Sequence, residues 1–254
     1  MTFRFDRRAL AAAVLVLWMA GMAMLSRRRH NIPEAELLAR GALRLEPSTY
    51  FYVVSQDSQQ IGSAMSSIDS SANGFTSREI VRVRTLIAGD SQSVAAASTA
   101  YLSRAFALDS FALSISGDLH PFRMRGTPEP HSGVLLPTLA PVAVMLTREP
   151  RIGQSGERWV YNPVARRVER VTLTIAAESL FSVVDSAAFD SASNSWIPAH
   201  QDTVRSWKIV TPTDGISAWV DSQGRIVAAR EAGGASLMRS TYEIATLNPG
   251  LRSH

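Results

Sequence analysis

From Thr49 onward the sequence alternates between short stretches of β-branched and aromatic residues and short polar turns. Asn73-Gly74, a strong hairpin signal, separates two such stretches. Seven of the eleven aspartates are followed directly by serine, and both side chains favour turns because they bond to nearby backbone groups. Strand candidates lie at 50–54, 61–68, 75–87, 93–102, 106–116, 121–125, 157–161, 167–176, 180–189, 203–211, 215–221, 225–231 and 235–245. This spacing predicts a mainly β fold, with a large curved antiparallel sheet that forms a half-barrel or sandwich.

Two segments depart from this pattern. Residues 33–45 begin with proline and two acids, which suits a helix start, and their leucines fall on one face. We expect residues 31–48 to form a juxtamembrane helix and connector that packs on the domain, and a helix that docks a partner is the alternative.

Residues 133–146 are apolar throughout and contain Pro137 and Pro141, which exclude a central strand. The segment is too short to span a bilayer. We predict a helix from about Thr138 to Thr147, buried against the concave face of the sheet. A lid over a ligand cavity, or a contact with membrane or partner, are alternatives. A hinge near 127–133 would divide the β domain, which covers 49–254.

Residues 9–25 form an uncharged run of 17 residues bracketed by arginines. As a helix this run would span roughly 26 Å, close to the thickness of a hydrocarbon core. We predict that residues 1–30 are a transmembrane anchor with basic flanks, a signal-anchor. A cleaved signal peptide is the alternative, but Arg27-Arg28-Arg29 follow closely and positive charge there disfavours export and cleavage.

The net charge of +4 comes from the flanks of this run. Residues 1–30 hold six arginines and one acid, whereas residues 31–254 hold 20 basic and 21 acidic side chains. Nucleic-acid binding needs clustered basic residues on the folded domain, so no nucleic-acid partner is expected. Equal numbers of arginines flank the run, so charge does not fix orientation. The β-rich, cysteine-free and Ser/Thr-rich composition favours an inner-membrane, single-pass protein with its C-terminal domain in the periplasm.

The sequence offers no recognisable catalytic chemistry. It has no cysteine, which excludes disulfides, thiol enzymes and zinc–cysteine sites. Motifs of serine hydrolases, zinc proteases, P-loops and dinucleotide-binding folds are absent. A hydrolase or metal site could use His120, His131 or His200, but their spacing requires neither. We therefore predict no catalytic residue, no cofactor and no metal, and a protein that is not an enzyme.

A large apolar surface is the remaining candidate site. The 134–146 segment supplies five apolar side chains, and the C-terminal half is rich in tryptophan, which can line a lipid or carbohydrate site or simply fill a core. The candidate residues are Leu135, Leu136, Leu139, Val142, Met145, Trp159, Trp207 and Trp219.

Several strand motifs resemble a β-rich accessory domain found with bacterial transglutaminase-like exported proteins. They begin with Tyr50-Phe51-Tyr52-Val53-Val54, Gln60-Ile61-Gly62 and Ser67-Ile68-Asp69. They continue with Ala100-Tyr101-Leu102-Ser103, Leu108-Asp109-Ser110-Phe111, Ala218-Trp219-Val220-Asp221, Gly224-Arg225-Ile226-Val227 and the closing 237–245. The resemblance covers about 49–246. A further resemblance is to curved-sheet periplasmic carriers of lipid or lipoprotein.

These resemblances imply two functions. A transglutaminase-like enzyme needs a cysteine nucleophile, so without cysteine the chain would be the non-catalytic accessory domain alone. It would then be a membrane-anchored periplasmic module that binds or assembles an envelope partner. The alternative is a carrier or sensor of a lipid-like apolar ligand held between the curved sheet and the 134–146 segment.

Overall fold

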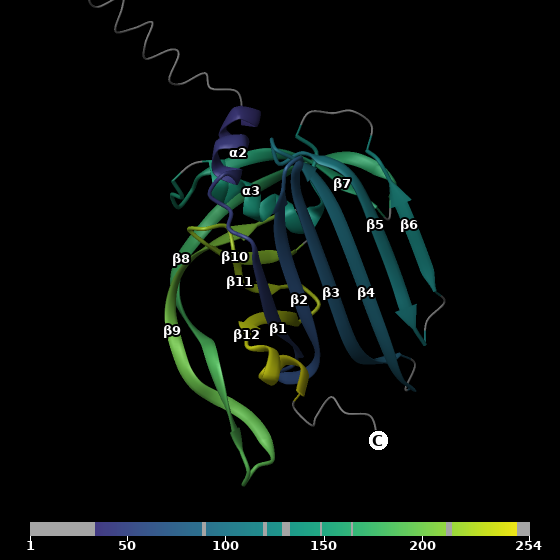
Figure 1. The fold of residues 1–254 in the computed structure, drawn as a ribbon, viewed down its shortest axis with the longest axis vertical. Helices are drawn as coiled ribbons and strands as arrows, with labels where there is room; N and C mark the ends of the chain where they lie inside the picture. Colours follow the sequence, from purple (N-terminus) through teal and green to yellow (C-terminus); the bar gives the residue numbers. More distant parts are fainter. Residues whose placement is uncertain are drawn as a thin grey trace, which may run out of the picture.

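One antiparallel sheet of twelve strands forms most of the molecule (Figure 1). The computed structural model describes residues 34–87, 90–118, 121–128, 133–147, 149–163, 165–211 and 215–247. The first six strands are β1 (Ser48–Gln56), β2 (Gln59–Ser71), β3 (Gly74–Ile87), β4 (Asp90–Ser103), β5 (Leu108–Gly117) and β6 (Phe122–Gly126). The others are β7 (Ser155–Asn162), β8 (Arg167–Asp190), β9 (Ser195–Val210), β10 (Ser217–Asp221), β11 (Ile226–Arg230) and β12 (Ala235–Ser240). The predicted mainly β fold with a large curved antiparallel sheet is confirmed.

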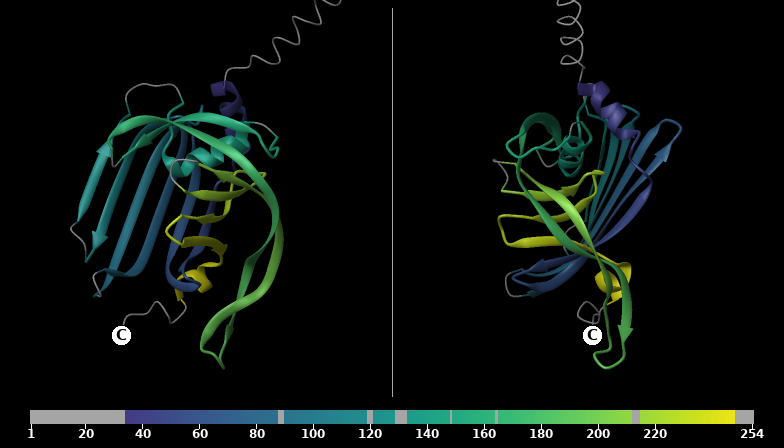
Figure 2. Two further views of the ribbon diagram at one scale, coloured as in Figure 1. Left: turned by 180° about the vertical axis from the view of Figure 1, so that it is seen from behind. Right: turned by 90° about the vertical axis from the view of Figure 1, so that its left-hand side faces the viewer.

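The sheet consists of two six-stranded meanders joined at one seam. Its order is β6-β5-β4-β3-β2-β1-β12-β11-β10-β9-β8-β7, so the first and last strands of the chain lie side by side at its middle. In the seam Phe51 pairs with Ser240 and Gln56 with Ala235. The sheet curls so that its two ends, β6 and β7, approach each other across the opening of a half-barrel (Figures 1 and 2).

A short helical segment occupies the concave side. It comprises the 3₁₀ turn η1 (Pro137–Leu139) and helix α3 (Ala140–Thr147), so the helix expected there is confirmed. Helix α3 is apolar around its whole circumference, which is typical of a fully buried helix. Val142 and Leu146 pack toward the β1–β6 half, whereas Val144 and Met145 pack against β7–β10. The helix therefore forms the shared core of the two halves.

The segment before η1 bridges the two ends of the sheet. The backbone amide of Leu108 in β5 donates to the carbonyl of Val134 at 2.8 Å. The next residue, Leu135, makes an isolated parallel bridge with Val160 of β7. Phe111 and Tyr161 then pack ring to ring across the gap, with centroids 5.0 Å apart. The half-barrel is thus fastened at one end by these contacts.

Helix α2 (Glu34–Ala42) lies within residues 33–45, where a short helix was expected, and contacts α3. The two helices approach closely at Gly41, where a Cβ atom would lie 2.2 Å from the carbonyl oxygen of Leu146. Only glycine fits there without moving one of the helices. The anchor predicted for residues 1–30 lies outside the described residues. Among the described helices, none is both long enough and apolar enough to cross a bilayer.

The predicted strands at 167–176 and 180–189 are one strand, β8, so the predicted break between them is wrong. Register shifts near Ala177 and Ser186 let the strand bend and continue without ending. Its partner β9 begins at Ser195, eight residues before the predicted start at 203. The expected strand 235–245 is also too long, because β12 ends at Ser240 and the chain turns into a π-helix, η2 (Glu243–Leu247).

Candidate functional site

Two cavities lie between the concave face of β1–β5 and the segment formed by η1 and α3. The first, of about 170 Å³, is lined by Tyr50 and Tyr52 of β1, serines of β1–β3, and Arg225 and its neighbours before β11. The second, of about 230 Å³, is lined mainly by apolar groups of β3–β5 and by Leu136 and Pro137. Because both are bounded by the 134–146 segment, they occupy the place where the sequence predicted an apolar ligand.

Glu79 and Thr138 line both cavities. Strand pairing places Tyr50, Ser66, Glu79, Ser98 and Leu113 in one row of the sheet, on the side facing η1. The Ser98 hydroxyl lies 3.3 Å from Glu79 Oε2. Burial raises the pKa of the Glu79 carboxyl above its ordinary value of 4.5, and hydrogen bonds with Thr138 and Ser98 offset only part of the increase. When protonated, this carboxyl can donate a hydrogen bond into either cavity.

Replacement of Glu79 by glutamine is expected to change how stability depends on pH. A raised folded-state pKa means that the native protein binds more protons than the unfolded chain. The contribution of Glu79 to stability should therefore be fully present below pH 4.5 and fall as the pH rises through the folded-state pKa of Glu79. Glutamine cannot ionise, so the stability of E79Q should not show this decrease with rising pH.

Urea denaturation of the full chain between about pH 4 and pH 8 tests this expectation. E79Q should gain stability relative to wild type as the pH rises. The control is E231Q, at an exposed acid beyond β11, which should follow the wild-type profile. Parallel profiles for wild type and E79Q would show that Glu79 does not titrate abnormally.

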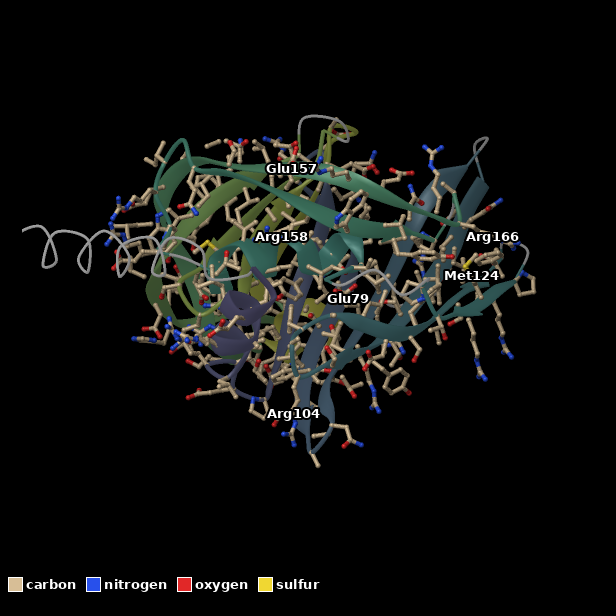
Figure 3. The ribbon with its side chains drawn as sticks, turned by 90° about the horizontal axis from the view of Figure 1, so that it is seen from above. Glu79, Arg104, Met124, Glu157, Arg158 and Arg166 are labelled. Carbon is tan, nitrogen blue, oxygen red and sulfur yellow. The ribbon has the colours of Figure 1, made fainter. Side chains whose placement is uncertain are left out.

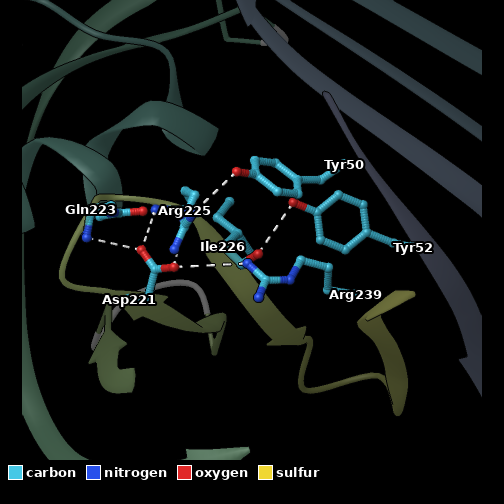
Figure 4. A network of polar contacts seen from close by, with 7 residues as sticks. All are labelled: Tyr50, Tyr52, Asp221, Gln223, Arg225, Ile226 and Arg239. Carbon is cyan, nitrogen blue, oxygen red and sulfur yellow. Dashed lines mark hydrogen bonds and ion pairs between the residues drawn. The ribbon is translucent and has the colours of Figure 1, made fainter. Parts of the chain in front are cut away.

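A buried ion network forms the side of the first cavity next to the seam (Figure 4). The side chain of Asp221 is only 3% exposed, and its Oδ2 lies 2.7 Å from Nε of Arg225 and 3.7 Å from Nη1 of Arg239. Asp221 Oδ1 accepts the backbone amides of Gln223 and Arg225, each at 2.9 Å. The predicted turn at 221–224 thus folds around its own aspartate and fixes the position of Arg225.

Two tyrosines of β1 complete the network from the other side of the seam. Arg225 and Arg239 both lie over the ring of Tyr50, at 5.9 and 5.2 Å from its centroid. Tyr52 donates its hydroxyl to the carbonyl of Ile226 at 3.2 Å. Burial raises the pKa of Tyr52 well above its ordinary value, against the opposing effect of Arg239, so this phenol stays protonated. The wall therefore combines fixed cations with neutral hydroxyls.

The candidate residues from the sequence do not all meet at one place. Leu136 lines the second cavity, and Leu139 and Val142 line the first. Leu135 and Met145 are buried in the core beside them. The tryptophans are dispersed, because Trp207 is buried in the core under α3, Trp219 packs edge-on against Phe181, and Trp159 is exposed on β7.

Trp159 borders a third cavity, of about 330 Å³, with arginines on its walls. Seen from above, Arg158 lies toward the middle of the molecule, whereas Arg104 lies at the periphery (Figure 3). Arg158 donates to the Thr147 hydroxyl at 3.3 Å, and burial lowers the pKa of its guanidinium. The lining of this cavity is mostly polar, whereas apolar groups predominate in the other two.

Of the three histidines considered for catalysis, His120 and His131 lie outside the described residues. His200 is exposed on β9 and its Nδ1 lies 2.8 Å from Oδ1 of Asp185, with Asp202 nearby at 4.0 Å. Its hydrogen bond with Asp185 raises the pKa of His200. The three side chains could hold a metal ion, but they stand exposed on two strands, remote from both cavities.

Glu79, Asp221 and Arg225 were not identified as site residues in the sequence. One available signal was the position of Glu79, an acid that alternates in phase with Val81 and Val83 on the apolar face of a strand. The ion network had no comparable signal, because Asp221 reads as an ordinary turn residue.

Comparison with known proteins supports the fold. No protein-family model matches the chain, and a search of curated proteins found no match. A solved structure, the β-barrel-like protein of domain of unknown function DUF1849 from Brucella abortus, is similar with a TM-score of 0.54. It shares 13% identity, and the match covers 78% of this chain and 96% of that chain. The similarity supports a β-rich, barrel-like architecture and does not support the association with transglutaminase-like proteins.

Proposed function

We propose that the chain is a non-catalytic binding module that holds a small apolar or amphiphilic ligand between the curved sheet and the 134–146 segment. The observation that carries the proposal is the pair of cavities on the two sides of Glu79 and Thr138. One is almost wholly apolar and the other is rich in hydroxyls, which matches the two ends of an amphiphile.

The size of the apolar cavity supports a ligand. Its volume of about 230 Å³ exceeds the roughly 150 Å³ of an engineered apolar protein cavity that stays dry and binds benzene. The volume suits a short alkyl chain and is far too small for a complete two-chain lipid. We therefore infer a single chain or chain end as the apolar part.

The walls of the other cavity support a polar head. Burial raises the pKa of the Glu79 carboxyl, which favours its protonated, hydrogen-bond-donating form, and Tyr50 lies two strands away in the same row. Arg225 is held by Asp221 with its Nη1 3.4 Å from the Tyr50 hydroxyl. These groups suit a head with oxygen atoms, such as a carboxylic acid or an alcohol.

We further propose that the domain binds this ligand in the periplasm and is held at the inner membrane by residues 9–25. No catalysis, cofactor or metal is involved. The absence of a cysteine nucleophile supports a binding role. An envelope protein as partner stays a separate prediction from the sequence.

Titration of the full chain in detergent with octanoic acid tests the proposal by calorimetry. Binding at one site is expected, with a negative heat-capacity change from burial of the alkyl chain. Acetate supplies the same head without the chain and should not bind. Equal heats for octanoate and acetate, or no heat from either, would contradict the proposal.

A further inference from the structure

The outer part of the β8–β9 hairpin projects beyond the rest of the sheet (Figure 1). Strand β7 pairs with β8 only up to Thr174, and β10 pairs with β9 only from Ser206 onward. Residues 180–190 and 195–205 therefore pair only with each other, as far as the structure describes the chain. We call these two stretches the arm.

The inner part of the arm packs on the molecule, since Val183 is buried and Phe181 contacts Trp219, whereas the part beyond Val184 is largely exposed. A two-stranded ribbon without further strands is marginally stable in water, and an unpaired edge is a template for another strand. Three large apolar residues of the arm face solvent, with Leu180 66%, Phe189 51% and Ile197 43% exposed. Phe189 also packs edge-on against Trp196 across the hairpin. The backbone and the exposed side chains of the arm are thus both suited to contact another surface.

The two edges of the arm are not equivalent. Pro198 lies in the β9 edge, where it lacks an amide donor and so hinders pairing with another strand. The β8 edge from Leu180 to Asp190 has no proline. The β8 edge is therefore the one able to accept a further strand.

Strand β6 offers a complementary edge. It is the last strand at the other end of the sheet and reads Phe-Arg-Met-Arg-Gly, with Arg123 and Arg125 exposed and Phe122 38% exposed. The arm holds three acids, Asp185, Asp190 and Asp202, and one arginine, Arg205. The arm is thus acidic where β6 is basic, and both expose apolar side chains. Their charges are therefore complementary.

We propose that the arm of one copy adds its β8 edge to the β6 edge of a second copy of this chain. The arm and β6 lie at opposite sides of the molecule (Figure 1). One molecule therefore cannot satisfy its own edges, and the contact runs from head to tail. Such a contact makes a ring or an open row of copies, not a closed pair through one shared patch.

The absence of cysteine allows a specific crosslinking test with the full chain purified in detergent. One variant carries A188C in the exposed outer part of the arm, and a second carries T127C directly after β6. When the two are mixed with a short bismaleimide, a crosslinked pair is expected, at a yield about tenfold above that of either variant alone. The control N73C, in the exposed β2–β3 turn, should give no product with A188C.

Charge reversal then tests the recognition. R123E with R125E in the T127C chain should lower the yield about tenfold, and D185R with D202R in the A188C chain should restore it. A yield that depends on neither reversal, absence of crosslinking, or equal crosslinking of A188C with itself would overturn the proposal. The outcome is distinct from ligand binding, because the cavities lie away from the arm and from β6.

Discussion

Replacement of Asp221 by alanine should lower the free energy of unfolding by about 3–5 kcal/mol, the usual cost of removing one member of a buried ion pair. The side chain is almost fully buried and is ion-paired with both Arg225 and Arg239. Without it both guanidinium groups stay inside the half-barrel with only the ring of Tyr50 as a common partner. The backbone amides of Gln223 and Arg225 lose their acceptor at the same time.

Urea denaturation of the full chain measures this loss. D69A, at an exposed aspartate at the end of β2, is the matched control and should change stability by no more than about 0.5 kcal/mol. D221N keeps an acceptor for the two amides but no charge, so its loss should fall between those of D69A and D221A. A D221A protein as stable as D69A would mean that the network contributes little to the fold.

Replacement of Ala96 by phenylalanine should abolish binding of the proposed ligand without unfolding the protein. Ala96 pairs with Val81 of β3 and lines the apolar cavity of about 230 Å³. A phenyl ring would occupy this space, and cavity filling commonly leaves stability unchanged or raises it by about 0.5–2 kcal/mol. The affinity for octanoic acid should therefore fall at least tenfold, by about 1.4 kcal/mol or more.

The control is A95F, one residue earlier on the same strand, where the side chain faces the other side of the sheet. Calorimetric titration should give wild-type affinity for A95F and little or no binding for A96F. Unchanged affinity in A96F, with the protein folded, would place the ligand elsewhere or exclude it.

Much of the fold follows from local patterns in the sequence. The turn at 221–224 and the α3 segment are found where they were expected, because each depends on nearby residues alone. The length of β8 could not be predicted. Register shifts let β8 continue through the Ala-Ala-Glu-Ser stretch, and beyond Val184 its side chains no longer alternate strictly between exposed and more buried positions. The end of β12 at Ser240 was missed because the next residues, including Tyr242 and Ile244, are equally strand-like.

The candidate site depends on contacts that local patterns do not contain. Tyr50 and Arg225 meet only because β1 and β12 pair, and periodicity does not reveal strand order. Likewise, the cavity beside Glu79 exists because Pro137 and Thr138 turn the chain back over β3–β5. The sequence could predict an apolar segment against a concave sheet, but not which side chains leave space beneath it.

Native mass spectrometry of the full chain, extracted from its own membrane in mild detergent, tests the central claim most directly. The account predicts one adduct of defined mass on the wild-type protein, of the size of a single-chain amphiphile. The same adduct should be present on A95F and absent from A96F. An adduct-free wild-type protein, or an adduct retained by A96F, would contradict a ligand held between the sheet and the 134–146 segment.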